Sequence, residues 1–197
     1  MLGAILKMYV TLIPLIITGI INALFCKSAF LNVLKVPIDG GRVMSDGKRL
    51  FGSNKTWKGF IGTIVISMIL NVLWGMFCSS FPAVRDWNYM YDYHQNEWDY
   101  NLLVGFLFGI SYAALELPNS YLKRRLDITS GKQISGVVGA FFKIYDQIDS
   151  LLGVMLVVAI FAHLSVKVYF VCVFLGGATH VVLNALLVAL KLRKTIL

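Results

Sequence analysis

The chain has 197 residues, of which 58% are hydrophobic and only 14% are charged, with a mean hydropathy of +0.75 and a formal net charge of +8. Soluble domains are roughly a quarter charged and less than about half apolar, so this composition excludes an ordinary soluble protein and indicates a membrane protein. At this length we expect one integral-membrane domain, residues 1–197, with no room for a separate soluble domain.

Five apolar stretches approach the ~20 residues that a membrane-spanning helix needs. In chain order they cover residues 8–26, 59–78, 101–117, 150–164 and 168–190. The third and fourth stretches are short, and we expect neighbouring residues to lengthen them. The first lacks the basic start and the cleavage site of a signal peptide, so we interpret it as a retained span. The sequence therefore predicts an all-α membrane protein with five transmembrane helices.

The basic residues are distributed unevenly between the two sides of these spans. Fifteen Lys and Arg residues follow the first, third and fifth spans, whereas the other side holds only Lys7, Arg85 and Lys167. The positive-inside rule then predicts an external N-terminus, a cytoplasmic C-terminus and two long cytoplasmic loops, in agreement with an odd number of spans. The basic loops would face anionic lipid and phosphate-bearing solutes, although setting the topology is reason enough for most of these residues.

Small and polar residues recur at every fourth position in two of the predicted spans. In the third span they are Gly105, Gly109 and Ala113, and in the second they are Gly59, Thr63, Ser67 and Asn71. Such spacing allows two helix backbones to approach closely. We therefore favour a packing role, with a polar cavity beside Ser67 and Asn71 as the alternative.

The loop between the first two spans, "VPIDGGRVMSDGKRLFGSNKTWKGFIG", is rich in Gly, Lys and Arg. Loops of this length in a compact domain tend to be functional or disordered. Backbone amides together with Lys55 and Thr56 at the head of a helix can form an anion site, although "GSNKT" lacks the Walker A spacing. Asp39 and Asp46 each precede a glycine, and we interpret them as turn formers rather than metal ligands.

Charged and polar residues follow the third span closely, in "ALELPNSYLKRRL". Glu116 lies at the cytoplasmic end of this span, and an ionisable residue at membrane depth is a functional hypothesis by default. Pro118 is expected to end or kink the helix. The residues that come next are Asn119, Ser120, Lys123, Arg124 and Arg125. Cations this close to carboxylates suit a phosphate-bearing ligand, while a basic membrane anchor is the simpler alternative.

Asp146 and Asp149, in "KIYDQIDSLLG", stand three residues apart at the predicted start of the fourth span and so share a helix face. One interpretation is a solvated acidic turn that meets the helix dipole. The other is a seat for Mg²⁺, which usually binds through one or two carboxylates plus substrate phosphates. Spacing alone leaves both open. His180 and Asn184 also share a face, in the fifth span, where hydrogen-bonded packing is the simpler role.

Together these segments resemble the CDP-archaeol synthase family, relatives of the phosphatidate cytidylyltransferases. The similarity runs over nearly the whole chain and covers "IINALF", "PIDGGR", "DGKRLFG", "KTWKGF", "ELPNSYLKRRL", "YDQIDSLLG" and "HVVLN". It implies transfer of a cytidylyl group from CTP to a membrane lipid phosphate, which releases pyrophosphate and leaves a CDP-activated lipid. The expected partners are CTP, the lipid phosphate and the bilayer, with no nucleic acid; the oligomeric state stays open.

The resemblance also implies roles for individual residues. Asp146 and Asp149 would hold Mg²⁺, the expected cofactor, while Lys123 and Arg124 would contact phosphates. Lys55, Thr56 and neighbouring glycines, among them Gly52, would help to form the nucleotide pocket. From their positions we add Glu116 to the catalytic group, and to the binding group we add Asn119, Ser120, His180 and Asn184.

Three other functions are alternatives to this activity. A small transporter or channel could use Glu116, Asp149 and His180, but it predicts polar residues through the full membrane depth, and the outer halves of the third and fourth spans are apolar. A CDP-alcohol phosphotransferase would need a longer motif than the "DGGR" at Asp39. A catalytically silent relative stays open, because Ser53 and Asn54 stand where the family usually has Asp-Gly.

Overall fold

The structure is a computed structural model that describes residues 2–129 and 135–190. Its five long helices are α1 (Leu2–Lys27), α2 (Trp57–Ser80), α4 (Trp98–Arg125), α5 (Gly136–Phe161) and α6 (Val166–Ala189). Each is long and apolar enough to cross a membrane. The prediction of five spans in an all-helical protein is therefore confirmed.

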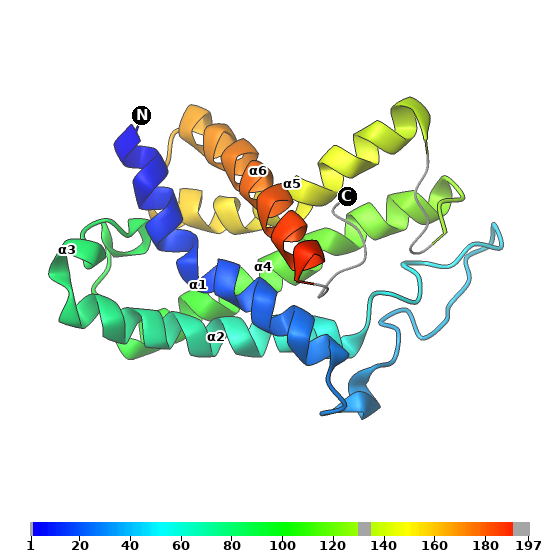
Figure 1. The fold of residues 1–197 in the computed structure, drawn as a ribbon, viewed down its shortest axis with the longest axis horizontal. Coiled ribbons are helices and arrows are strands. Elements are labelled where there is room, and N and C mark those ends of the chain that lie inside the picture. The colour runs from blue at the N-terminus through cyan, green and yellow to red at the C-terminus, as the bar shows by residue number, and fades with distance from the viewer. Residues whose placement is uncertain (1, 130–134, 191–197) are drawn as a thin grey trace.

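Short elements connect the long helices, and the described residues contain no strand. They are the 3-10 helix η1 (Asn32–Leu34), the helix α3 (Pro82–Arg85) and the 3-10 helix η2 (Tyr89–Tyr91). Figure 1 shows α2 and α4 running along the long axis of the molecule, with α1 and α6 on one side of them. α1 bends near its middle, where Pro14 removes a backbone donor from the helix.

The third and fourth helices extend well beyond the predicted spans. α4 runs through Pro118 and ends at Arg125, so the proline does not end this helix; in a membrane bundle, neighbouring groups re-satisfy the backbone that a proline frees. α5 begins at Gly136, which puts Asp146 about three turns inside the helix. The first turn of α5 has no acidic residue, so the interpretation of the Asp pair as an acidic first turn is wrong.

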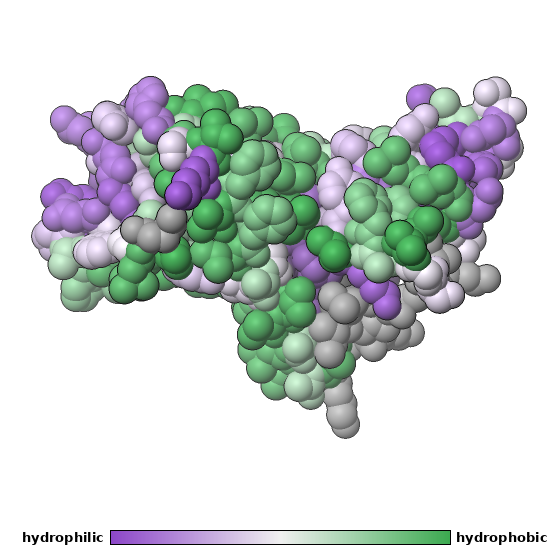
Figure 2. Space-filling model, turned by 90° about the horizontal axis from the view of Figure 1, so that it is seen from above, coloured by the Kyte–Doolittle hydropathy of each residue, from purple (hydrophilic) through white to green (hydrophobic). Residues whose placement is uncertain are grey.

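The outer surface of the bundle suits a lipid environment. Apolar side chains cover the middle of the molecule, and hydrophilic ones gather towards its two ends (Figure 2). Large apolar side chains from several helices are half or more exposed, among them Ile69, Leu73, Leu156, Val182 and Leu186. A soluble monomer rarely exposes a continuous apolar surface of this extent, which agrees with a multi-pass membrane protein.

α2 and α4 pack closely, and Gly105, Gly109 and Ser67 of the predicted small-residue stripes lie at this interface. Gly59 of the α2 stripe instead faces Cys26 of α1. A Cβ added at Gly105 would lie 2.6 Å from Met68 Cα and 2.7 Å from Ser67 O. Ser67 is buried in this interface, and Asn71 donates to Ser67 O at 2.9 Å. The packing role is therefore confirmed, and the alternative of a polar cavity beside Ser67 and Asn71 is wrong.

Gly105→Ala is expected to destabilise the protein by about 1–3 kcal/mol, because its methyl group meets the α2 backbone and the two helices must separate. Thermal or denaturant unfolding in detergent measures the effect. Gly19→Ala is the matched control, since a Cβ at Gly19 meets nothing within 4 Å. Equal stability of the two variants would contradict the proposed close approach.

Lys58 ties the start of α2 to the end of α1. Its side chain is buried, and its Nζ donates to Ser28 O at 2.7 Å and to Asn32 Oδ1 at 3.2 Å. The ammonium also lies 4.9 Å from the centroid of the Phe25 ring. A helix C-terminus carries unpaired carbonyls and partial negative charge, so the buried cation is well placed there.

We call the end of the bundle formed by loop 28–56, the last turns of α4 and the first turns of α5 the basic end; it lies at the right of Figure 1. The opposite end carries segment 81–97 and buries apolar side chains together with Thr11, Asn88 and Asn101, whose side-chain oxygens accept hydrogen bonds from this segment. Its core includes Met8, Val104, Phe108, Val154, Met155, Val158, Cys172 and Val173. A transporter would need polar residues through the full depth of the membrane. The residues of this core are apolar, which does not favour that alternative.

Candidate functional site

Asp39 organises loop 28–56 at the basic end. Its carboxylate accepts hydrogen bonds from the backbone N–H groups of Gly41 (3.0 Å), Phe51 (3.2 Å) and Gly52 (2.9 Å), and it pairs with Arg49. Its side chain is fully buried. The bond to Gly41 N is a local turn, as predicted, and Asp46 makes the same kind of turn with Lys48 N at 3.1 Å.

Burial alone would raise the pKa of Asp39, but the Arg49 guanidinium and the three backbone donors outweigh it and hold this pKa well below its usual 3.8. A depressed carboxyl pKa contributes stability above its unfolded-state value and loses that contribution as the pH falls through the folded-state value. Asp39 therefore holds the loop fully above about pH 3.8 and releases it progressively in stronger acid.

Asp39→Asn is expected to loosen loop 28–56 at neutral pH, because an amide supplies one acceptor oxygen and turns its NH₂ towards backbone donors. A loss of about 1–3 kcal/mol from the local contacts corresponds to roughly 5-fold to 150-fold faster limited proteolysis within the loop. Asp46→Asn, at a partly exposed carboxylate, is the control and should change the rate much less. Wild-type cleavage rates in Asp39→Asn between pH 5 and 7 would contradict this role.

The loop is docked on the end of α4 by two arginines. Arg124 Nε donates to Phe51 O at 3.0 Å, and Arg125 donates to Lys48 O at 3.2 Å and Arg49 O at 2.6 Å. Arg125 also pairs with Asp46. The basic run after the third span therefore holds the loop against α4, a long-range contact that local sequence does not show.

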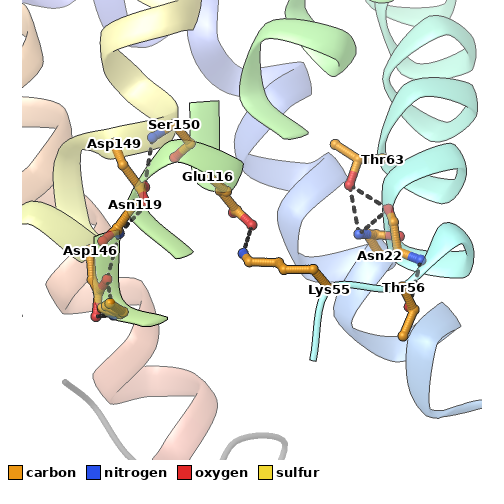
Figure 3. Close-up of polar contacts among 11 residues, drawn as sticks. Asn22, Lys55, Thr56, Thr63, Glu116, Asn119, Asp146, Asp149 and Ser150 are labelled. Carbon is orange, nitrogen blue, oxygen red and sulfur yellow. Dashed lines mark hydrogen bonds and ion pairs between the residues drawn. The ribbon is translucent and has the colours of Figure 1, made fainter. Parts of the chain in front are cut away.

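We call the group formed by Asn119, Lys123, Asp146 and Asp149 the carboxylate cluster; it lies between α4 and α5. Figure 3 labels Asn119, Asp146 and Asp149. Asn119 Nδ2 donates to Asp146 Oδ1 and to Asp149 Oδ2, at 2.6 Å in each case. Lys123 Nζ contacts both oxygens of Asp146, Oδ2 at 2.6 Å. Asp149 is only 5% exposed and accepts a further bond from Ser150 N at 2.7 Å.

A close helix contact brings the two halves of this cluster together. A Cβ at Gly153 of α5 would lie 2.9 Å from Ser111 O of α4, so α5 packs directly on the α4 backbone one turn beyond Asp149. This approach lets the short side chain of Asn119 reach both carboxylates. The cluster thus depends on a glycine, as the α2–α4 pair does.

Gln147 fixes the opposite face of α5. Gln147 lies between the two aspartates in the sequence, and its side chain is buried. Its Oε1 accepts a hydrogen bond from Asn184 Nδ2 at 3.0 Å. His180 Nδ1 lies 3.4 Å from Gln147 O. His180 and Asn184 therefore contact α5 behind the aspartates and hold its rotation, so that Asp146 and Asp149 face Asn119.

Lys55 and Glu116 form an ion pair beside the cluster (Figure 3). Burial disfavours the ammonium, but Glu116, and with smaller effect Asp149 and Asp146, keep the pKa of Lys55 above its usual 10.5. Lys55 therefore stays charged at neutral pH. Thr56 has a structural role as well, because its side chain caps α2 by accepting from Gly59 N at 3.3 Å.

A cavity of about 420 Å³, which we call the main cavity, lies between α1, α2, α4 and α6 and reaches this ion pair. Much of its lining is apolar and includes Leu12, Leu15, Leu151 and Leu183. We call the polar part beside the ion pair, formed by Asn54, Lys55, Thr56 and Glu116, the rim. Ser150 (next to Asp149) and His180 also line the cavity. A largely apolar cavity with a small number of polar groups is typical of a ligand site.

Asn22, which our reading of the sequence did not single out, lines the same cavity. Its Nδ2 donates to Thr63 Oγ1 at 2.8 Å and to Gly59 O at 3.3 Å (Figure 3). The sequence does carry a signal for Asn22: a polar amide inside an apolar span is costly unless it has a hydrogen-bonding or functional role. Gln147 carried the same signal.

Apart from Ser120, the predicted site residues fall into two groups. Asp146, Asp149, Asn119, Lys123, Glu116 and Lys55 lie together, with Thr56, His180 and Asn184 on the adjoining cavity wall. Arg124 and Gly52 instead line a second pocket of about 360 Å³, together with Lys48 and Arg49. Ser120 is buried on α4, and no hydrogen bond from its side chain joins it to the carboxylate cluster.

The donor chemistry of the cluster fits a hard divalent cation such as Mg²⁺. Such ions take oxygen ligands from carboxylates, amide carbonyls and substrate phosphates. Asp146 and Asp149 supply carboxylate oxygens, and Asn119 Oδ1 is a buried oxygen without a hydrogen-bond partner among the described residues. Within those residues, His, Cys, Asp and Glu alone do not form a three-ligand group, so any ion here would draw on other oxygens.

Comparisons with known proteins identify the family of the chain. The model of the CarS-like CDP-archaeol synthase family matches residues 2–196. The CDP-archaeol synthase of Thermococcus kodakarensis is 34% identical over 103 residues, 51% of this chain and 52% of that protein. The CDP-archaeol synthase of Sulfolobus acidocaldarius is 27% identical over 195 residues, 98% of each chain. The chain spans about half the length of the Thermococcus kodakarensis protein and of the related CDP-archaeol synthase of Pyrococcus furiosus.

A solved structure shares the fold. It is described as "Structural insight into an intramembrane enzyme for archaeal membrane lipids biosynthesis", with a TM-score of 0.59, 20% sequence identity, and coverage of 92% of this chain and 94% of the other. At this identity the likeness concerns the fold alone. Because the family model covers almost the whole sequence, the chain belongs to the CDP-archaeol synthase family.

Proposed function

We propose that this protein transfers the cytidylyl group of CTP to the phosphate of a membrane lipid, forming a CDP-activated lipid and releasing pyrophosphate. Family membership supports this activity. The observation that carries it in the structure is the junction of two environments: the apolar main cavity ends at Lys55 and Glu116, beside the carboxylate cluster. A lipid tail suits the first environment, and a nucleotide triphosphate suits the second.

The charged residues address the main obstacle to this reaction, which is repulsion between two polyanions. Lys55 and Lys123 each rest against a carboxylate, on Glu116 and Asp146. Both ammonium groups are therefore already positioned and can contact phosphate oxygens when the substrates arrive. Fixed charges that are already aimed at the place where negative charge develops stabilise it without any cost of reorganisation.

The nucleophile of this reaction needs no strong catalytic base from the protein. A lipid phosphate is already an oxyanion at neutral pH, so its oxygen can attack the α-phosphorus of CTP without a strong base. The new bond joins that oxygen to the α-phosphorus, and the bond between the α-phosphorus and the oxygen that bridges to the β-phosphate breaks, so that pyrophosphate leaves. The residues of the site mainly have to align the two substrates, an effect that can be worth about 7–11 kcal/mol. The rim residues Asn54, Lys55 and Thr56 border the place where the two would meet.

Mg²⁺ is the cofactor we propose, held by Asp146 and Asp149. Bound there, it would neutralise phosphate charge and orient the attacking and leaving oxygens. Lys123 forms an ion pair with Asp146 in this structure. For Asp146 to bind Mg²⁺, the Lys123 ammonium would have to leave it and move towards the substrate phosphates. Its flexible side chain allows this without any change in the backbone.

We further propose that the basic end faces the cytoplasm and that the active site opens there, where CTP is available. Eleven described basic residues lie at that end: Lys27, Lys35, Arg42, Lys48, Arg49, Lys55, Lys58, Lys123, Arg124, Arg125 and Lys143. Lys7, Arg85 and Lys167 lie at the other end, which agrees with the positive-inside rule. Lys132, Lys191, Arg193 and Lys194, which entered the prediction, lie outside the described residues.

This orientation predicts the labelling of two exposed positions in intact cells. In a variant without the native cysteines, Asp86→Cys should react with a membrane-impermeant maleimide, and Ser53→Cys should react only after permeabilisation. The reverse pattern would overturn the proposed orientation, and the enzymatic proposal would then need an external source of CTP.

The activity is tested with purified protein in detergent, CTP, Mg²⁺ and a panel of lipids. The panel holds an isoprenoid ether lipid phosphate, a diacyl phosphatidate, and the matching lipid alcohols that lack phosphate. We expect CDP-lipid and pyrophosphate in equal amounts from at least one lipid phosphate, and no product from the alcohols. If no lipid phosphate in the panel yields a nucleotide-lipid, the chain is a silent relative, as the Ser53-Asn54 departure allows.

A further inference from the structure

Asn119 joins the two carboxylates of the cluster, yet its own oxygen is unused. Its Nδ2 donates to Asp146 Oδ1 and Asp149 Oδ2 (Figure 3). The residue is only 3% exposed, and its Oδ1 is buried with no hydrogen-bond partner among the described residues. Buried polar atoms in folded proteins are nearly always paired, so the unpaired oxygen requires a physical reason.

The orientation of this amide follows from the charges around it. Carboxylate oxygens only accept hydrogen bonds, so the NH₂ group has to face Asp146 and Asp149 while nothing else lies between them. An amide oxygen in that place would repel both carboxylates. A divalent cation between the carboxylates reverses this preference, because it repels N–H groups and attracts oxygen.

We propose that Asn119 Oδ1 is a third protein ligand of the cation held by Asp146 and Asp149, and that its amide turns from hydrogen-bond donor to oxygen ligand when the cation binds. The turn needs only rotation about the terminal torsion of the side chain, which has a broad energy profile. Amide carbonyls are suitable ligands for Mg²⁺ and for Mn²⁺. This inference rests on the proposed metal site of the enzyme.

A structural clamp is the competing role for the same residue. In that role the NH₂ group only holds the two carboxylates together, and its removal weakens cation binding through their mutual repulsion, without any bond from Oδ1 to the ion. If Oδ1 is a ligand, its removal also weakens binding, and the amide carbon lies next to the bound metal. Asn119→Leu removes both groups while nearly keeping the side-chain volume, so unchanged or tighter binding excludes the ligand role, and a direct coupling between the metal and the amide distinguishes the ligand from the clamp.

The experiment is a Mn²⁺ titration of the purified protein without CTP, followed by the electron paramagnetic resonance signal of free Mn²⁺. We expect Asn119→Leu to weaken Mn²⁺ binding by about tenfold or more, whereas Asn119→Asp, which keeps an oxygen, should retain it. Asn101→Leu is the matched control, because Asn101 is a buried amide at the other end of α4 that pairs with Tyr91 and Asn96. Binding in Asn119→Leu as tight as in wild type, or tighter, would overturn the proposal.

A second measurement does not depend on whether Asn119→Leu folds. Wild-type protein labelled with ¹³C-asparagine and loaded with Mn²⁺ should show a ¹³C hyperfine coupling from a metal-bound amide, and Asn119→Asp should lose it. No coupling in the loaded wild-type protein would refute the inference.

The titration also separates this inference from the proposed function. Asp149→Asn in the same series reports whether the carboxylates bind the ion at all. Wild-type protein without an Asp149-dependent site would refute the metal site and the ligand role together. A site that depends on Asp149 but not on Asn119 would refute only the ligand role.

Discussion

Asp149→Asn is expected to lower kcat for CDP-lipid formation by about a thousandfold or more, because it removes a charge that orders the cluster and that we propose holds the metal. The substitution keeps the volume of a side chain that is only 5% exposed, so the protein should still fold. The initial rate with CTP and the preferred lipid phosphate measures the effect, and thermal unfolding in detergent confirms that the variant is intact.

Asp86→Asn is the control for this variant. Asp86 is an exposed carboxylate that pairs with Arg85 at the opposite end of the bundle, and its loss should leave kcat unchanged. Turnover of a folded Asp149→Asn protein at the wild-type rate would remove Asp149 from the site and with it the role assigned to the cluster.

Lys123→Met is expected to lower kcat/KM for CTP by about a hundredfold. The ammonium is the nearest cation to Asp146, and we expect it to contact phosphate in the loaded enzyme. Removing it also frees Asp146, so the Mg²⁺ concentration for half-maximal activity should fall even as the rate falls. A purely structural role for Lys123 would not produce these opposite changes.

Two further variants accompany this measurement. Lys123→Arg, which keeps the charge, should recover part of the activity, and Lys167→Met, at an exposed lysine of the opposite end, should behave as wild type. An Mg²⁺ requirement that rises in Lys123→Met would contradict the exchange of Lys123 between carboxylate and phosphate.

The five spans and the main acidic residues were predictable from the sequence, because both signals are local. Apolar runs of the right length identify membrane helices, and ionisable residues at membrane depth are costly enough to be informative. The small-residue stripe through Gly105 was equally readable, because helix spacing brings its members to one face. These features need no knowledge of which segments meet.

The features that were missed or misjudged depend on contacts between distant segments. The start of α5 at Gly136 was hidden by the polar residues of "KIYDQID", so the Asp pair was placed at the head of the helix instead of about three turns inside it. Arg124 is predicted to contact phosphates with Lys123, and that role stays a prediction, since its Nη1 is buried without a hydrogen-bond partner among the described residues. Consecutive residues on a helix point about 100° apart, so the two side chains leave α4 in different directions. In the structure Arg124 holds loop 28–56 through Phe51 O.

The role of Asn119 shows the same limit. The sequence places it near Glu116, but only the packing of α4 on Gly153 brings its amide to both carboxylates. Asp39 was predicted as a turn former, and it does form that turn. Its bonds to Phe51 and Gly52 across the loop could not be read from the neighbouring residues.

The most direct test of the central claim is the fate of the CTP phosphorus atoms. Purified protein is incubated with Mg²⁺, a lipid phosphate and CTP that carries ³²P at either the α or the γ position. The account predicts that α-label enters the lipid fraction while γ-label leaves as pyrophosphate. Transfer of γ-label to the lipid, or no label in the lipid from either CTP, would contradict it.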